Sequence, residues 1–192
     1  MTMRKSKQET ALTRARIVKA AASEFRQHGI VATGLADLMS AAGLTHGGFY
    51  RHFASKEQLV AEASAAGLAA TTEKFAAAAS REPGRKGLEA LVCSYLSTAH
   101  RDNRRDGCPL AALGSELARA DRVTRNAATA AFLKLVDILA GQIDAAKPEE
   151  AKKRAMVAVS TMIGALTMSR IMNDKRLSNS LLRNAQEVLT DS

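Results

Sequence analysis

Cysteine, proline and aromatic residues are scarce in this sequence of 192 residues. Cys93 and Cys108 are its two cysteines, and no apolar signal leader follows Met1. We therefore expect neither a disulfide scaffold nor a secreted protein, and a reducing cytoplasm fits the chain best. Three prolines and 4% aromatic residues disfavour β-sheets, which prefer β-branched and aromatic side chains. The composition predicts an all-α fold.

Long hydrophobic runs are also missing. A membrane-spanning helix requires roughly 20 consecutive apolar residues, and the longest candidate, 156–168, is interrupted by serine, threonine and glycine. Apolar residues nevertheless make up 46% of the chain, which is enough to bury the core of one or two small domains without disulfides. We expect a protein that folds in water and has no membrane partner.

Positive charge is in excess and gathers near the N-terminus. The chain has 28 Lys and Arg against 19 Asp and Glu, a net charge of +9, which favours polyanionic partners and nucleic acid above all. Two interpretations of the basic N-terminal segment are open: a solvated arm, or a segment that contacts nucleic acid. Its first nineteen residues contain Arg4, Lys5, Lys7, Arg14, Arg16 and Lys19 against Glu9 alone.

The first sixty residues predict three short helical segments. Thr13 can cap a first helix that stops near Gly29. A second helix over 35–42 closes at Gly43, and a third short segment follows through Tyr50. Helix, glycine turn and second short helix are the parts of a helix-turn-helix motif.

The rest of the chain predicts a helical bundle. Ser55 and Gln58 form a capping box that opens a long alanine-rich helix running past Phe75. Pro109 suits the first turn of a later helix. Apolar periodicity places the other helices over 88–99, 110–120, 132–143, 149–173 and 181–189.

The segment 149–173 differs from the others because it carries two apolar stripes. Its first stripe consists of Met156, Val159, Ile163 and Leu166, and its second of Val157, Gly164, Met168 and Ile171. A helix with two apolar faces needs two sets of neighbours, so we expect a homodimer formed through the last two helices. The alternative is that both are core helices of a monomer.

Gly47 and Gly48 stand in the third segment, where each lowers helical stability by roughly 1 kcal/mol relative to alanine. A surface without side chains would let the helix approach base edges in a DNA groove, whereas the alternative is an ordinary turn. Donors for DNA surround the pair: His46, Tyr50, Arg51, His52 and Lys56. Phe49 and Phe53 are expected to be core residues that fasten the segment to the face of the first helix with Ile17 and Phe25.

One continuous motif resembles the DNA-binding signature of the tetracycline-repressor (TetR) family. It reads Ala41-Ala42-Gly43-Leu44-Thr45-His46-Gly47-Gly48-Phe49-Tyr50-Arg51-His52-Phe53, followed by Ser55-Lys56-Glu57. The resemblance covers about residues 10–60, and the later helices agree with the family in number, length and order. It implies a DNA-binding domain over 1–57 and an effector-binding and dimerisation domain over 58–192.

The same resemblance implies a homodimeric repressor of double-stranded DNA. Such a protein binds a palindromic operator and is released by a small-molecule effector, without a cofactor or metal. By motif position, Thr45, Tyr50 and Lys56 would contact phosphates, while His46 and Gly47 would face bases. His52 is a further candidate for the DNA backbone.

The sequence departs from the family at Gly34. Many relatives have a threonine there that caps the second helix and contacts a phosphate. Thr33 is the nearest hydroxyl in this chain, so it takes the place of that threonine among the candidates.

The effector is expected among the middle helices, where a bundle of this length can leave an apolar cavity. Tyr95, Phe132, Met162 and Leu166 are candidates for its wall, with plain core residues as the alternative. His100 is either a polar anchor in that cavity or a surface histidine.

The two cysteines are expected to differ in environment. Cys108 follows Arg104-Arg105-Asp106-Gly107 at a helix start, and such a setting favours reactive cysteines. It is either a sensor of oxidants or electrophiles or an inert thiol packed beside Pro109. Cys93 lies within an amphipathic stripe and is expected in the core.

Enzymatic functions are not expected. The sequence contains no phosphate-binding glycine loop, no His-Glu-x-x-His metal motif and no nucleophile elbow. The rival to a DNA-binding regulator is a ligand sensor or helical scaffold that has lost DNA binding and uses its basic segment for another acidic partner. The presence of His46, Tyr50 and Lys56 argues against that loss.

Overall fold

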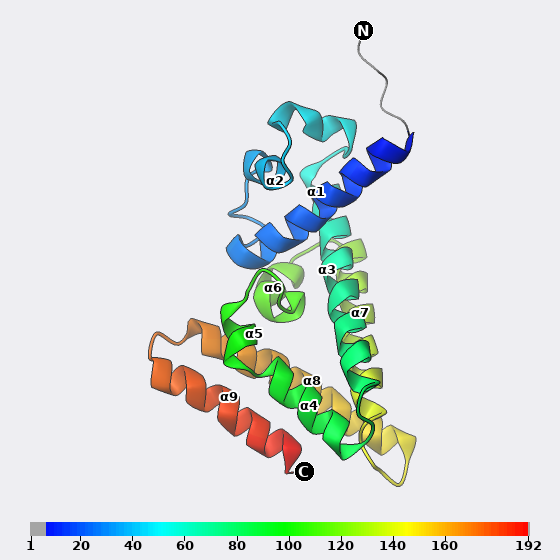
Figure 1. Cartoon of the computed structure of the whole chain (residues 1–192), viewed down its shortest axis with the longest axis vertical. Helices are drawn as coiled ribbons and strands as arrows, with labels where there is room; N and C mark the ends of the chain where they lie inside the picture. The colour runs from blue at the N-terminus through cyan, green and yellow to red at the C-terminus, as the bar shows by residue number, and fades with distance from the viewer. Residues whose placement is uncertain (1–6, 192) are drawn as a thin grey trace.

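Ten helical segments and no strand make up residues 7–191, the part of the chain that the computed structural model describes. The expected all-α fold is confirmed. A head contains α1 (Lys7–His28), α2 (Leu35–Ala41) and the 3-10 helix η1 (His46–Arg51). The long helix α3 (Lys56–Ala79) leaves this head and runs beside α7 (Arg122–Ala140) into the body of the molecule (Figure 1).

The body is a bundle at the opposite end of the molecule from the head (Figure 1). Its α8 packs against both α7 and α9, and its α4 packs against α3 and α9. The short α6 contacts α1, α3, α7 and α8, so it lies where head and body meet. The remaining helices are α4 (Arg85–Tyr95), α5 (Thr98–Asp102), α6 (Pro109–Leu117), α8 (Pro148–Ile171) and α9 (Lys175–Thr190).

The first helix is longer than predicted. Thr13 lies inside α1, which is already helical at Lys7, so the expectation that Thr13 caps this helix was wrong. No glycine or proline lies between Lys7 and Thr13 to stop the helix earlier. Arg4 and Lys5 lie outside the described residues. At the other end the prediction is confirmed, because α1 stops at His28 and Gly29 has a φ of +90°, which favours glycine.

Serine side chains begin two of the later helices. The Ser55 hydroxyl accepts the backbone N–H of Gln58 at 3.2 Å, which confirms the predicted cap, while the Gln58 side chain accepts the N–H of Ala54 rather than that of Ser55. The single helix expected over 88–99 is divided into α4 and α5. Ser97 causes the break, because its hydroxyl accepts the N–H of His100 at 3.1 Å and starts a new helix.

Two hydrophobic clusters fill the fold, and they share helices. The cluster in the head extends to Leu59 and Ala63 of α3 and to Leu113 and Leu117 of α6. The cluster in the body includes Phe75 of the same α3, together with residues of α4, α6, α7, α8 and α9. Because α3 and α6 contribute to both clusters, they connect the core of the head with the core of the body.

Two acidic side chains tie the head together and to the body. Glu62 of α3 forms a bidentate ion pair with Arg14 of α1, and the hydrogen bonds from Arg14 hold the pKa of this carboxyl below its ordinary value. Arg14 is therefore part of the packed head and not of a solvated arm. Glu116 of α6 accepts the backbone N–H groups of Ile30 and Val31 at 2.8 and 3.0 Å, so one carboxylate joins the body to the turn between α1 and α2.

We expect Glu116→Gln to lower the free energy of unfolding by about 1 kcal/mol, because two charge-assisted hydrogen bonds to backbone amides become neutral ones. Urea denaturation at one protein concentration measures this change. Glu89→Gln is the matched control, since Glu89 pairs with Arg85 on the surface, where an ion pair contributes only about 0–1 kcal/mol. Equal effects of the two substitutions would contradict the assigned role of Glu116.

Candidate functional site

The surface of the head carries a short 3-10 helix, η1, in which Phe49 is buried and most other residues are exposed. Thr45 precedes it with extended backbone, and Thr45, His46 and Gly47 are exposed. Tyr50 is 69% exposed and Arg51 is exposed as well. The sequence predicted a third helix at this position. The structure corrects its type, because the bonds from Gly48 N–H to Thr45 and from His52 N–H to Phe49 span three residues.

Two buried phenylalanines hold η1 against the head. Phe49 and Phe53 are 0% and 2% exposed, and their rings stack with centroids 5.6 Å apart. Both belong to the cluster that contains Ile17 and Phe25, which confirms the predicted core role. The ring of Tyr50 meets Phe49 edge-on at 5.1 Å, so the exposed tyrosine is positioned by a buried neighbour.

The fold does not require glycine at position 47. Gly47 has no positive φ, and a Cβ added there would meet nothing within 4 Å. A Cβ at Gly48 would lie 3.5 Å from the terminal methyl group of Met39, which is ordinary contact. Neither backbone strain nor crowding therefore explains Gly47, and its surface is open to another molecule. The exposed donors on both sides of it suit a polyanion.

Lys56 has partners within the head. Its ammonium group donates to the carbonyl oxygens of Ile30 and Thr33 at 2.9 and 2.7 Å. An ammonium group has three N–H donors, so one remains for an external phosphate. His52 is half-buried, and its carbonyl oxygen accepts a hydrogen bond from Arg14 at 3.3 Å.

Thr33 is turned inward. It is 3% exposed, and its hydroxyl donates to the carbonyl oxygen of Gly29 at 2.5 Å. The hydroxyl therefore supports the turn between α1 and α2 and is not presented at the surface of the head. Gly34 is the N-cap of α2, and the Asp37 carboxylate accepts its N–H at 3.2 Å.

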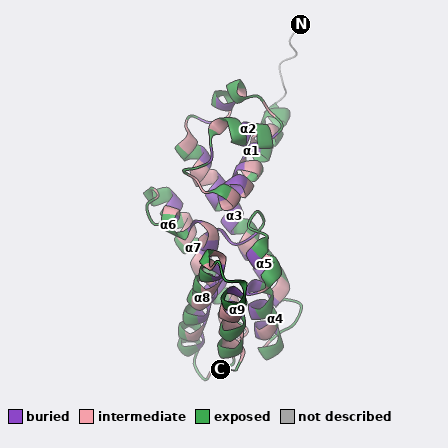
Figure 2. Cartoon of the chain, turned by 90° about the vertical axis from the view of Figure 1, so that its left-hand side faces the viewer, coloured by how far each residue is buried: buried purple, intermediate pink, exposed green. Residues whose placement is uncertain are grey.

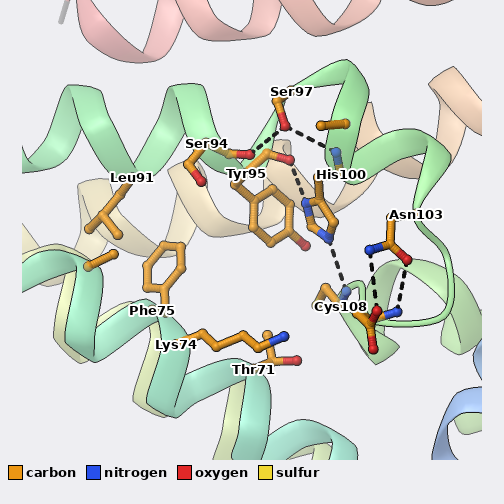
Figure 3. A pocket seen from close by; sticks show the side chains of 13 residues that line it. Thr71, Lys74, Phe75, Leu91, Ser94, Tyr95, Ser97, His100, Asn103 and Cys108 are labelled. Carbon is orange, nitrogen blue, oxygen red and sulfur yellow. Dashed lines mark hydrogen bonds between the residues drawn. The ribbon is translucent and has the colours of Figure 1, made fainter.

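A second candidate site is a cavity of about 350 Å³ in the body, between α3, α4, α5 and the loop before α6. The structure brings Tyr95, His100 and Cys108 together in its wall (Figure 3). Phe132, Met162 and Leu166 do not line it and pack in the body cluster instead, where Met162 and Leu166 are 1% and 0% exposed. Helical periodicity predicts only that a side chain faces inward. It could not tell the residues that line the cavity from those that pack in the body cluster.

His100 is fixed by backbone groups on both ring nitrogens. Its Nδ1 lies 2.7 Å from the carbonyl oxygen of Tyr95, and its Nε2 lies 3.1 Å from the backbone nitrogen of Cys108. A carbonyl oxygen only accepts and a backbone N–H only donates, so the ring is neutral and carries its proton on Nδ1. Burial, together with the positive charges of Arg170 and Lys74, holds the pKa of His100 below its ordinary value.

Tyr95 contributes a buried hydroxyl without a hydrogen-bond partner. The residue is 6% exposed, and burial raises the pKa of its hydroxyl well above the ordinary value. Cys108 beside it is 1% exposed. Cys93 is exposed on α4, so its expected core position was wrong. The inward face of α4 is formed by Leu88, Leu91, Val92 and Tyr95, which turns position 93 outward.

Residues 7–191 contain neither a candidate membrane-spanning helix nor a candidate metal site. Each helix of residues 7–191 is too short or too polar to serve as a membrane span. Within the same range, no three His, Cys, Asp or Glu side chains gather where they could hold a metal ion.

An all-helical chain whose head has this geometry is a helix-turn-helix DNA-binding protein. Comparison with known families agrees. The profile described as bacterial regulatory proteins of the tetR family matches residues 17–63, and the profile for the LmrA/YxaF-like C-terminal domain of transcriptional regulators matches residues 85–186. The chain therefore belongs to the TetR family of transcriptional regulators. Members of this family bind DNA and are not enzymes, in agreement with the sequence analysis.

Individual relatives support this assignment over most of the chain. An uncharacterised HTH-type transcriptional regulator of Mycobacterium tuberculosis is 31% identical over 170 residues, which are 84% of this chain and 86% of the relative. A TetR regulator from Chloroflexus aurantiacus has a similar structure, with a TM-score of 0.77 and 26% identity over 96% of this chain and 95% of that one. NemR from Escherichia coli in its reduced form gives a TM-score of 0.74 at 20% identity, over 93% and 95% of the two chains.

Gly47→Ala should weaken binding to an operator selected from random duplexes by roughly tenfold, because a methyl group then stands where the DNA must approach. The free energy of unfolding should stay the same or rise by up to about 1 kcal/mol, since alanine restricts the unfolded chain. Fluorescence anisotropy and urea denaturation measure the two quantities. Gly114→Ala, at an exposed position of α6 where an added Cβ also meets nothing within 4 Å, is the control. Loss of DNA affinity in both variants would contradict the interpretation of Gly47.

The lowered pKa of His100 makes stability depend on pH. Folded protein resists protonation of this ring, whereas the unfolded chain takes up the proton near the ordinary pKa of 6.5. Stability should therefore be complete above that value and fall as the pH drops below it. Urea denaturation between pH 7.5 and 5.5 should show a steeper loss in the wild type than in His100→Gln. If His100→Gln leaves the dependence of the unfolding free energy on pH unchanged, His100 is not the cause of that dependence.

Proposed function

We propose that the chain is a ligand-responsive repressor that binds a palindromic operator as a homodimer and is released by a small-molecule effector. The observation that carries the DNA-binding part is the exposed, side-chain-free surface at Gly47, flanked by donors and held by buried phenylalanines. A repressor acts where the chromosome lies, so we place its action in the cytoplasm.

In the proposed complex, η1 presents its exposed face to the major groove. Thr45, Tyr50 and Lys56 bind phosphates, and His46 and Gly47 approach base edges. Arg51 is exposed beside them and His52 lies at the end of η1, so both add to the phosphate contacts. We leave Thr33 out of this interface because its hydroxyl is buried and bonded to Gly29.

The outer face of α8 supports dimerisation. Val157, Met168 and Ile171 are 60%, 44% and 63% exposed, and a Cβ added at Gly164 between them would meet nothing within 4 Å. Met156 belongs to the other predicted stripe, but it is 42% exposed and extends this outer face. Figure 2 shows exposed residues along the outer sides of α8 and α9. A second copy of the chain would cover this apolar surface, which water would otherwise solvate at a cost in free energy.

One loop offers a route from the cavity to the DNA-binding head. His100 accepts the backbone N–H of Cys108 in the cavity wall, at the end of the loop 103–108. The middle of the same loop contacts α1, where Arg105 pairs with the buried Glu24 at 2.8 Å and its carbonyl oxygen accepts a hydrogen bond from Arg26 at 2.6 Å.

An effector that moves this loop therefore changes the support of α1. If the conformation with bound effector has the heads at a spacing that does not fit the operator, the effector lowers DNA affinity. DNA then lowers effector affinity by the same factor.

The experiment that tests the proposal combines oligomeric state with DNA binding. Multi-angle light scattering should give the mass of a dimer, and anisotropy should show tight binding to a selected palindrome. Tyr50→Phe should weaken binding to all duplexes, whereas His46→Ala should change the preference among them. A monomer that binds no duplex at low salt would favour the alternative, a helical sensor without DNA binding.

A further inference from the structure

The cavity in the body contains two hydrogen-bond donors that lack a partner in the described part of the chain. The Tyr95 hydroxyl is buried beside the Cys108 thiol and has no nitrogen or oxygen partner, and the residue is 6% exposed. Lys74 of α3 is an exposed residue that lines the same cavity, and it forms no ion pair within residues 7–191. Figure 3 shows the Lys74 side chain extending from α3 along the side of the cavity that faces Tyr95. A buried hydroxyl without a partner lowers stability, so its retention indicates a use in binding.

Most of the other polar groups around the cavity already have partners. Both ring nitrogens of His100 are bonded to backbone groups. The Thr71 hydroxyl donates to the carbonyl oxygen of Gly67 at 3.0 Å, and the Ser97 hydroxyl both donates to Ser94 and accepts from His100. What the cavity offers to a ligand is therefore chiefly donors, and a matching ligand must supply acceptors.

The charge around these donors favours an anion. Arg170 donates to the carbonyl oxygens of His100 and Arg101 at 2.9 and 3.1 Å, and its positive charge reaches the Tyr95 hydroxyl. Asp106 is the acidic residue in the cavity wall, but its carboxylate accepts a hydrogen bond from Asn103 and interacts with the positive charge of Arg26. The ammonium group of Lys74 is left without a counter-ion.

The remainder of the cavity is apolar and small. Phe75, Ala78 and Leu91 line it, and the ring of Phe75 meets that of Tyr95 edge-on with centroids 6.3 Å apart. Its volume of about 350 Å³ lies at the lower end of the range of about 300–1,000 Å³ found for small-molecule sites. The space suits a single ring or a short acyl chain.

We propose that the effector is a small aliphatic or aromatic monocarboxylate. Its two carboxylate oxygens accept hydrogen bonds from the Tyr95 hydroxyl and the Lys74 ammonium group, and its apolar body contacts Phe75 and Leu91. A neutral amide or alcohol of the same shape lacks the charge and brings an N–H or O–H donor to a site that already has donors. This inference rests on the proposed ligand response and names the chemistry of its site.

Isothermal titration calorimetry on the full chain tests the proposal with 4-methylbenzoate and hexanoate as acids. At least one acid should bind, and roughly tenfold more tightly than the matched neutral probes 4-methylbenzamide, 4-methylbenzyl alcohol and hexanamide, since hydrogen bonds to a charged group differ from neutral ones by that order. Tyr95→Phe and Lys74→Gln should each weaken the acid by roughly tenfold. Lys86→Gln is the control, because Lys86 is exposed on α4 and does not line the cavity.

Thermal unfolding separates a binding role from a structural one. Tyr95→Phe should melt at the same temperature as the wild type or higher, because it removes a buried hydroxyl that has no partner. Any of three results would overturn the carboxylate site: no binding of either acid at millimolar concentration, equal binding of the acids and the neutral probes, or unchanged acid affinity in both cavity variants.

Operator binding in the presence of the same probes distinguishes this inference from the proposed function. If an acid binds as expected but does not release the operator, the ligand response fails while the carboxylate site stands. If another compound releases the operator and neither acid binds, the ligand response stands and the carboxylate assignment fails.

Discussion

The burial of Phe49 and Phe53 is the interaction on which the DNA-facing surface depends. A six-residue 3-10 helix with two glycines does not form in isolation, because each glycine lowers its stability by about 1 kcal/mol and the hydrogen bonds of such a helix are poorly aligned. Each buried phenylalanine contributes about 1.5–3 kcal/mol, which outweighs that loss. The two rings anchor the buried side of η1. Its exposed side can therefore carry the residues that we propose to contact DNA.

The position of the head likewise depends on contacts with the body. The turn after α1 is held by Glu116 of α6 and by the Lys56 ammonium group, and the middle of α1 is held by Arg105 of the loop before α6. The position of α1 therefore depends on α6 and on the loop before it, and this loop also forms part of the cavity wall. In the proposed ligand response, a displacement of this short segment would alter the support of α1.

Features that the fold does not explain point to both proposed ligands. Gly47 lowers local stability although neither its φ nor its surroundings require glycine. The Tyr95 hydroxyl lies buried without a partner, although phenylalanine would fill the same space. Each residue is unfavourable in the isolated chain, and the two proposals give each a use: a close approach of DNA at Gly47 and a hydrogen bond from the Tyr95 hydroxyl to an effector.

Local patterns in the chain were sufficient to predict most of its helices, its glycine stops at Gly29 and Gly43, the cap at Ser55 and the core role of the two phenylalanines. These features arise from interactions over a few neighbouring residues, which sequence spacing records directly. Packing alone decided that Lys56 bonds to Ile30 and Thr33, and that Tyr95, His100 and Cys108 meet in a cavity which Met162 and Leu166 do not reach. Such contacts join helices that are distant along the chain, and helical periodicity tells which face of a helix is buried but not which neighbour covers it.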